Sequence, residues 1–277
     1  MRDLYKEIGD VLGGGTDYAI VPMADKTYES AAATTVVTTG AGAGDNLTWT
    51  YITARTSFTD PTDYIRNSYH TPSIRFDGST EHVYGVDADF WSSGDGVNDS
   101  AMSIGIWLKV PESPTALQQL FSKDGNTAGR EWFLRYNATG TGYDFVMRDV
   151  SASVSTVVAS SALQPGVWQH IVVTYDGAGG ATAGNTVSIY VNAVESSTPT
   201  NNASYVAMEN GGARPMIMAR NATEGSTGGN AWAVGRVLGG PCGPFLTKKE
   251  LTATQVLRLF EIGRAAQEPT APHAFIV

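Results

Sequence analysis

Near its middle the chain reads Met102-Ser103-Ile104-Gly105-Ile106-Trp107-Leu108-Lys109-Val110. Aliphatic residues and one methionine occupy every second position of this segment, and small, polar or aromatic residues lie between them. Successive side chains of a β-strand point to opposite faces of a sheet, so a period of two is typical of a strand with one face in a core. The segment therefore predicts a strand over residues 102–110.

Similar segments continue toward the C-terminus, each bounded by Gly, Asp, Asn or Pro. They lie at residues 118–122, 131–136, 143–148, 155–160, 168–175, 186–194 and 215–220. No strand alternates with a helical pattern, which argues against a parallel α/β sheet. The sequence predicts an all-β fold, a two-sheet antiparallel sandwich, with Trp168 buried together with Ile106 and Val172.

A short helix is predicted at the N-terminus. Leu4, Ile8, Val11 and Leu12 form one apolar stripe, and Gly13-Gly14-Gly15 ends the helix. Only weak strand candidates follow, at residues 18–22, 34–38 and 47–53. We expect residues 1–72 to be an arm whose apolar stripe attaches to a partner or to a second copy, and residues 70–277 to fold without it.

A second helix is predicted near the C-terminus. Thr252-Ala253-Thr254-Gln255 is a capping box, in which the Thr252 hydroxyl can accept from the first free backbone N–H groups. Val256, Leu259 and Phe260 then form an apolar stripe, and Gly263 is expected to end the helix. The sandwich is expected to span residues 73–265, followed by a tail at 266–277.

The composition bears on several classes of partner. The net charge of −9, without a Lys/Arg cluster, argues against nucleic acid and anionic membranes. The single Cys242 cannot form a disulfide within the chain and is expected to be buried. No apolar run is long enough to span a bilayer, and the N-terminal residues lack the apolar region of a signal peptide.

Several motifs resemble laminin-G-like, concanavalin A-like lectin/glucanase jelly rolls. They read Ser73-Ile74-Arg75-Phe76-Asp77-Gly78-Ser79, Ser103 to Lys109, Leu120-Phe121-Ser122-Lys123-Asp124-Gly125, Trp168 to Gly177, Ser188-Ile189-Tyr190-Val191-Asn192, and Phe245 to Phe260. They follow one another in the order found in that family. The resemblance implies a jelly-roll sandwich over residues 73–264 that binds glycans or proteins. The same fold hosts lectins, glucanases, receptor modules and virion proteins.

Catalysis is not expected. A glycosidase needs two carboxylates facing each other across a groove. The glucanases that the chain resembles carry them as Glu-x-Asp-x-x-Glu on one strand, and no such run occurs here. Glu131 and Asp144 lie on different predicted strands and are expected to face solvent. His170 is expected to pack at the edge of the core, on the same face as Trp168.

Calcium is the one cofactor that the sequence suggests. A loop of thirteen residues holds Asp87, Asp89, Asp95, Asn98 and Asp99, which offer the oxygen ligands that Ca²⁺ prefers. The resemblance adds that laminin-G-like domains often hold calcium at the rim of the sandwich. The alternative is that these are solvated loop residues.

Five aromatic residues are candidates for stacking against sugar rings: Trp91, Trp132, Tyr136, Tyr143 and Trp232. Aromatic residues at alternating strand positions are more often part of a core, and the sequence does not choose among these five.

Two functions fit these observations. The first is a structural component of a virus or phage particle, a capsid decoration or appendage, with a major shell protein or a second copy as partner. The second is a carbohydrate-binding module of a surface or secreted protein. A particle-bound lectin would satisfy both.

Overall fold

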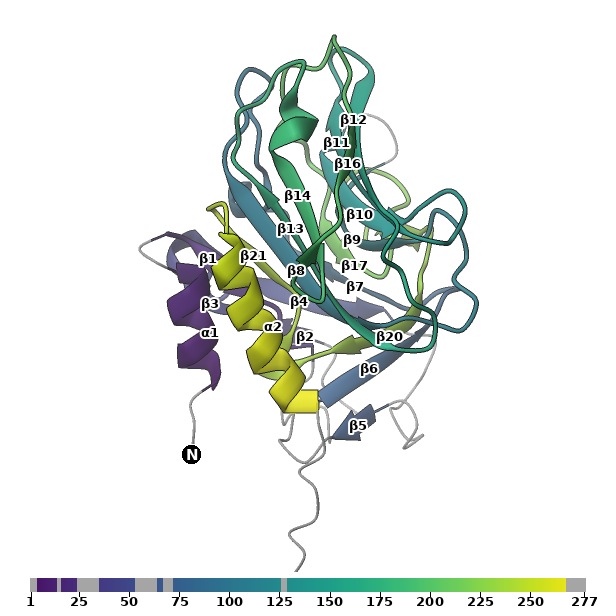
Figure 1. Cartoon of the computed structure of the whole chain (residues 1–277). Coiled ribbons are helices and arrows are strands. Elements are labelled where there is room, and N and C mark those ends of the chain that lie inside the picture. The colour runs from purple at the N-terminus through teal and green to yellow at the C-terminus, as the bar shows by residue number, and fades with distance from the viewer. Residues whose placement is uncertain are drawn as a thin grey trace, which may run out of the picture.

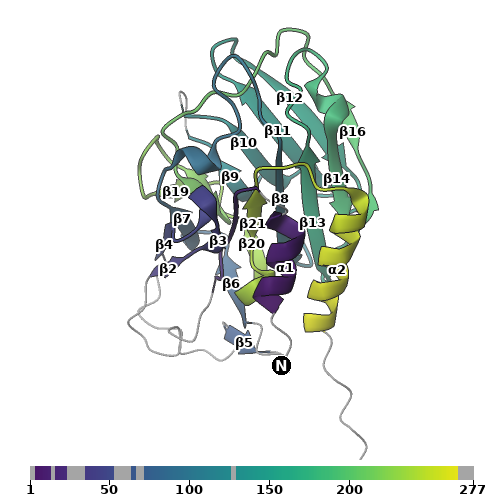
Figure 2. The same cartoon turned by 90° about the vertical axis from the view of Figure 1, so that its left-hand side faces the viewer.

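The computed structural model describes residues 4–13, 16–23, 35–52, 64–66, 72–125 and 129–267. Two antiparallel sheets pack face to face, and two helices lie side by side outside one of them (Figures 1 and 2). Of the predicted tail, residues 268–277 lie outside the described residues. Neither helix in the described part of the chain has the length and hydropathy to span a bilayer.

The first sheet has ten strands within the described residues. Its main path is β15-β14-β13-β8-β20-β6-β5, and β21 pairs with β8 and carries β1 and then β3. The bounds are β15 (Val194–Glu195), β14 (Val187–Val191), β13 (Trp168–Tyr175), β8 (Met102–Lys109), β20 (Val234–Leu238), β6 (Pro72–Asp77), β5 (Tyr64–Arg66), β21 (Phe245–Thr247), β1 (Tyr18–Ile20) and β3 (Thr39–Ala41).

The second sheet has nine described strands in the order β16-β12-β11-β10-β9-β17-β7-β4-β2. They are β16 (Thr198–Thr200), β12 (Val154–Ser160), β11 (Tyr143–Asp149), β10 (Trp132–Tyr136), β9 (Gln119–Lys123), β17 (Pro215–Ile217), β7 (His82–Gly85), β4 (Thr48–Ile52) and β2 (Thr35–Val37). A small hairpin joins β18 (Arg220–Asn221) to β19 (Gly229–Asn230). Short 3₁₀ turns are η2 (Gly42–Gly44), η3 (Asp89–Trp91), η4 (Ala183–Thr186) and η5 (Gly240–Cys242).

The alternation that predicted the sandwich is the alternation that builds it. Ile104, Ile106 and Leu108 of β8 point into the main core between the sheets. Trp107 points the opposite way, into a second apolar cluster under the helices. The predicted strand over residues 215–220 is interrupted, because Met218 has a positive φ of 64° that an extended strand does not allow. The predicted all-β sandwich is confirmed.

The two helices cover part of the outer face of the ten-stranded sheet. They are α1 (Leu4–Gly13) and α2 (Ala253–Gln267). Ile8 and Leu12 of α1 are buried in the cluster that also holds Trp107, Val172 and Val256. The capping box is confirmed, since Thr252 N–H donates to Gln255 Oε1 at 3.0 Å and Gln255 N–H donates to Thr252 Oγ1 at 3.3 Å.

The segment before residue 73 takes part in both sheets. β1 pairs with β21, β5 pairs with β6, and β4 pairs with β7. Ile8 and Leu12 pack within the chain, and Leu4 and Val11 lie partly buried beside them. The apolar stripe predicted to attach to a partner therefore docks on the chain's own sandwich, because a helix this short is stable only with a packed face.

Two expectations about packing are wrong. Gly263 does not end the second helix, which continues to Gln267. Its missing side chain makes room for the Trp107 ring, whose Cζ2 would lie 2.8 Å from a Cβ at this position. Trp168 is only half buried and packs with Val172 on the outer face, whereas Ile106 points into the main core. Residues 106 and 168 lie on adjacent strands but on opposite faces.

Candidate functional site

Three loops meet at one end of the sandwich. They are residues 86–101 between β7 and β8, the described residues 124–125 and 129–131 between β9 and β10, and residues 201–214 between β16 and β17. We call this end the rim. The last residue of β9, Lys123, lies opposite Trp132 of β10 and Pro215 of β17, so its side chain starts where all three loops converge.

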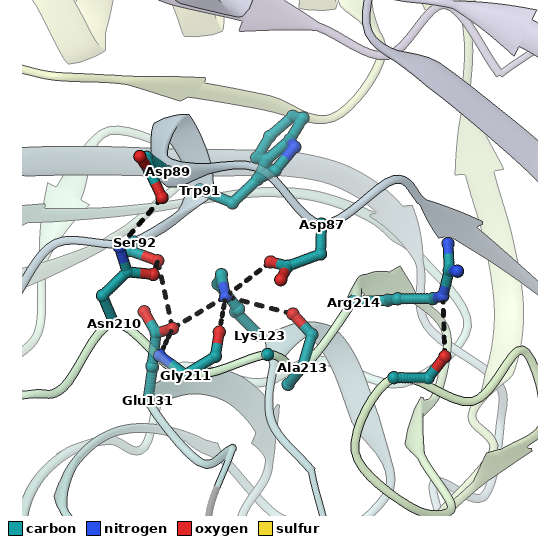
Figure 3. Close-up of polar contacts among 12 residues, drawn as sticks. Asp87, Asp89, Trp91, Ser92, Lys123, Glu131, Asn210, Gly211, Ala213 and Arg214 are labelled. Carbon is teal, nitrogen blue, oxygen red and sulfur yellow. Dashed lines mark hydrogen bonds and ion pairs between the residues drawn. The ribbon is translucent and has the colours of Figure 1, made fainter.

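Lys123 is fully buried and is the centre of the rim (Figure 3). Its ammonium nitrogen Nζ lies 2.7 Å from Glu131 Oε1 and 3.0 Å from Asp87 Oδ1. It also donates to the carbonyl oxygens of Gly211 at 2.6 Å and Ala213 at 3.1 Å. One cation thus joins all three loops, and its buried charge is compensated by two carboxylates and two carbonyls.

Glu131 is the second buried charge of the rim. Burial raises the pKa of its carboxyl from 4.5 to about 7, although Lys123 and the hydrogen bonds to Oε1 act in the opposite direction. Oε1 accepts from Gly211 N–H at 2.8 Å and contacts the Ser92 hydroxyl at 3.1 Å. Oε2 has no hydrogen-bond partner among the described residues. The carboxyl is held in one orientation by contacts to a single oxygen.

The exposed surface above these charges is polar. Asn210 Nδ2 donates to Asp89 Oδ1 at 2.9 Å, and Asn210 Oδ1 lies 2.8 Å from the Ser92 hydroxyl. Both Asn210 and Asp89 are exposed. Behind them Lys248 Nζ donates to the Ser92 carbonyl, and burial lowers the pKa of Lys248 to about 8. The rim therefore exposes an amide and a carboxylate, and the residues beneath them are joined to one another by hydrogen bonds and ion pairs.

The residues predicted to bind calcium do not converge. Asp87 binds Lys123, and Asp89 accepts from Asn210. Asp95 accepts from the N–H groups of Val97 and Asn98 in its own turn, at 2.8 and 2.6 Å. Among the described residues, which include this whole loop, no group of three or more His, Cys, Asp or Glu could hold a metal ion. The predicted calcium cluster is wrong, because each carboxylate already has a local partner.

Asp99 is the most enclosed of these residues. It accepts from the hydroxyls of Tyr175 and Tyr205 at 2.7 and 2.8 Å and from Met208 N–H at 2.8 Å. Burial raises the pKa of its carboxyl despite these bonds. These bonds join the loop to β13 and to the 201–214 segment.

Four of the five candidate aromatic platforms are core residues. Trp91, Trp132, Tyr136 and Tyr143 are fully buried. Trp132 Nε1 donates to the Trp91 carbonyl at 2.9 Å, and Tyr143 OH donates to Gln169 Oε1 at 2.8 Å. The core role that is commoner at such positions is therefore confirmed for these four, and their candidacy as sugar platforms is wrong. Trp232 is half buried, next to Gly229, and its Nε1 has no hydrogen-bond partner in the described structure.

The predictions for isolated polar residues divide. Cys242 is buried and its thiol pKa is raised to about 12, as expected of a core cysteine. His170 is confirmed as a packing residue, since its ring stacks on Trp107 with centroids 4.7 Å apart. Glu131 and Asp144 are buried, so their predicted exposure is wrong. Both lie beside a cation, Lys123 for Glu131 and Arg135 for Asp144 at 3.0 Å.

Comparison with known families gives one match. A family model described as the Concanavalin A-like lectin/glucanases superfamily matches residues 77–235, more than half of the chain. The chain belongs to this concanavalin A-like superfamily. The predicted resemblance is confirmed, and the matched residues include Lys123 and all three loops of the rim. No curated protein matches the chain.

Solved structures agree with the concanavalin A-like fold at low sequence identity. The binding domain of botulinum neurotoxin serotype D has a TM-score of 0.54 and 11% identity, covering 89% of this chain and 51% of that one. A botulinum neurotoxin type C structure has a TM-score of 0.57 and 12% identity, covering 95% and 53%. A sialidase of Trypanosoma rangeli in complex with sialic acid has a TM-score of 0.51 and 10% identity, covering 95% and 38%. This chain spans about half the length of the neurotoxin chains, and these likenesses concern the fold alone.

The rim of this concanavalin A-like domain brings two carboxyls together around a lysine. Glu131 and Asp87 both contact the Nζ of Lys123. A glycosidase pair needs space for a sugar between the two groups. Here the lysine fills that space and Glu131 has no exposed surface. The arrangement is suited to fixing loops in place.

Proposed function

We propose that this chain is a non-catalytic recognition module that binds a saccharide at the rim. The observation that carries this proposal is the fully buried Lys123, which binds residues of all three loops, next to the exposed and mutually hydrogen-bonded Asn210 and Asp89. Loops held in their binding conformation before a ligand arrives lose less entropy on binding.

The exposed groups suit a saccharide. Sugar hydroxyls both donate and accept, and the Asn210 amide with the Asp89 carboxylate offers both kinds of partner side by side. Cell entry of botulinum neurotoxin type C, one of the structures similar to this chain, is dependent upon interaction with two ganglioside molecules. That property belongs to the whole neurotoxin chain, of which this chain covers 53%.

Binding is tested with a glycan array followed by calorimetry on the best saccharide. Asn210→Ala and Asp89→Ala each remove one of the exposed side-chain groups of the rim. Each should raise the dissociation constant about tenfold or more. Glu195→Gln, an exposed change on β15, is the control and should leave affinity unchanged. Absence of saccharide binding, or binding that both rim variants leave unchanged, would overturn the proposal.

Catalysis is tested in the same samples. We expect no turnover of the bound saccharide over hours, because the carboxyls of Asp87 and Glu131 both contact the Lys123 ammonium. Product formation that Glu131→Gln abolishes would show that the buried pair acts on substrate.

The particle-borne role predicted from the sequence stays a prediction. The α1 stripe packs within the chain, so a chain carried on a virus or phage particle would attach through a different surface. Mass spectrometry and microscopy of purified particles would test it, by finding or not finding this chain beside a more abundant shell protein.

A further inference from the structure

Three cations form a row across the outer face of the ten-stranded sheet. Arg236 of β20 lies directly opposite Arg75 of β6 on one side and Lys109 of β8 on the other. Their side chains point away from the core, because the neighbouring Phe76, Leu108 and Val237 fill it. The row lies on the same face of the sheet that the helices cover. Lys109 is two residues after Trp107 on β8, and Arg236 is two residues before Leu238 on β20. We call Arg75, Arg236 and Lys109 the cation row.

The fold does not require this row. Like charges placed opposite each other on neighbouring strands destabilise a sheet. The chain has 27 acidic residues against 18 Lys and Arg, so carboxylates to separate these cations are abundant. Yet Arg75 and Lys109 are exposed, and neither forms an ion pair with any carboxylate among the described residues. The two outer cations of the row thus remain without a carboxylate partner among the described residues, whereas Arg236 between them has other contacts, among them a hydrogen bond from Nη1 to Ser73 Oγ at 3.4 Å.

The row lines a pocket of about 290 Å³. The other lining residues are Phe76, Val110, Pro111, Glu112, Gly166, Val234 and Gly235. Glu112 lies at the wall beside Gly166, whose φ of +77° and open Cβ position admit the carboxylate. A Cβ there would lie 2.5 Å from Glu112 Oε1. The pocket therefore combines three cations, one carboxylate and an apolar wall.

An aromatic side chain extends the row. Trp168 of β13 lies directly opposite Lys109 on the far side from Arg236. It points to the same face and is half buried, packed against the edge of the cluster under the helices. Sugar rings bind by placing their apolar face on such a ring, while cations hold an acidic substituent.

We infer that this pocket is a second binding site, for the carboxylate or sulfate group of an acidic saccharide. Arg75 and Lys109 bind the oxyanion on either side of Arg236, Trp168 on the next strand supports the sugar ring, and Glu112 accepts from a hydroxyl. The site is separate from the rim and does not depend on it. The negative charge of the whole chain opposes long polyanions such as nucleic acid, whereas a single acidic group reaches the local positive field.

The test is calorimetry of the full chain with 3′-sialyllactose, 3′-sulfolactose, lactose and sodium sulfate. Wild type should bind one or both acidic sugars at least tenfold more tightly than lactose or free sulfate. Equal affinity for free sulfate would overturn the saccharide assignment in favour of a simple oxyanion site. Failure to bind either acidic sugar would overturn the whole proposal. Binding confined to anionic lipid vesicles would also overturn it, in favour of a lipid headgroup.

Variants locate the site. Arg75→Gln with Lys109→Gln should weaken acidic-sugar binding at least tenfold. The charge-matched control, Lys249→Gln with Arg264→Gln on and near α2, should leave it unchanged. Because the pocket variant removes repulsion between neighbours, its Tm without ligand should be equal to or above that of wild type, which separates lost binding from unfolding. Equal weakening in both double variants would mean that net charge alone binds the sugar.

The two proposals fail separately. Asn210→Ala at the rim should leave acidic-group binding in the pocket intact, and the pocket variant should leave neutral-sugar binding at the rim intact. If Asn210→Ala lost acidic-sugar binding and the pocket variant kept it, the acidic group would bind at the rim, and the pocket proposal would be overturned.

Discussion

A buried lysine is rarely predictable from a sequence, and Lys123 shows why. Its family motif, Leu120 to Gly125, indicates a strand and turn, which the structure has. Its compensation comes from Asp87, Glu131 and Gly211, the last of them 88 residues away. Such partners become neighbours only when the strand order is known. The same reason explains why alternation alone left Trp132 open between core and ligand platform.

At this scale we predict that Lys123→Met destabilises the fold by about 3–5 kcal/mol, because it leaves Glu131 buried without its cation. Adding Glu131→Leu should recover part of the loss, since the unpaired charge is then removed. Urea unfolding of both variants measures this. Lys249→Met, at a lysine with more exposed surface, is the control. An unchanged urea midpoint for Lys123→Met would show that the cluster contributes little to stability.

At the scale of elements, sequence patterns correctly predicted those helices and strands whose formation depends mainly on neighbouring residues. Period-two patterns located β8 and β13, and the Thr252 capping box located the start of α2. β7 and β20 escaped prediction, since both are short, contain a glycine and owe their pairing to distant strands. The predicted end of α2 was wrong for the same reason. Glycine at position 263 makes room for the ring of Trp107, which lies on β8.

Gly263 gives the prediction for this scale. Glycine to alanine inside an exposed helix usually stabilises by up to about 1 kcal/mol. Here a new Cβ would meet the Trp107 ring, which itself stacks with His170 and Phe260 at centroid distances of 4.7 and 5.6 Å. Gly263→Ala should therefore destabilise by about 1–3 kcal/mol. Trp107→Phe in the same chain should reduce the penalty, and Thr254→Ala, at an exposed position of α2, is the control. A stabilised Gly263→Ala would contradict the close packing of α2 on β8.

At the scale of the whole molecule, the sequence predicted the layers but not how the chain is divided among them. Residues 1–72 resembled an arm because their apolar runs are short. Pairing with β21, β6 and β7 shows where those short runs belong. That residues 70–277 fold alone stays a prediction, against which these pairings argue. The outer face is likewise shared between helices over Trp107 and the cation row beside them, a division set by three strands at once.

Buried titratable groups predict how stability of the whole chain depends on pH. Burial lowers the pKa of His170 from 6.5 to about 3, so below pH 6.5 the unfolded chain binds a proton that the folded chain refuses, and stability rises with pH over this range. Burial raises the pKa of Glu131 from 4.5 to about 7, so between these values the folded chain keeps a proton that the unfolded chain releases, and stability falls as pH rises. Asp99, with its raised pKa, acts in the same direction as Glu131.

The two slopes oppose each other between pH 5 and 6.5, so the wild-type contribution of this pair should be nearly flat there. Single variants should reveal each slope. Glu131→Gln leaves His170 alone, and its stability should fall by about 2 kcal/mol relative to wild type as pH drops from 6.5 to 5. His170→Phe leaves Glu131 alone, and its stability should rise by a similar amount over the same drop. The phenylalanine preserves the stacking on Trp107, and His170 Nδ1 has no partner to lose within the described structure. Urea midpoints at pH 5, 5.75 and 6.5 measure the slopes, which are independent of any constant loss caused by the substitutions. If wild type and both variants gave parallel profiles, burial in the fold would not be keeping Glu131 protonated or His170 neutral.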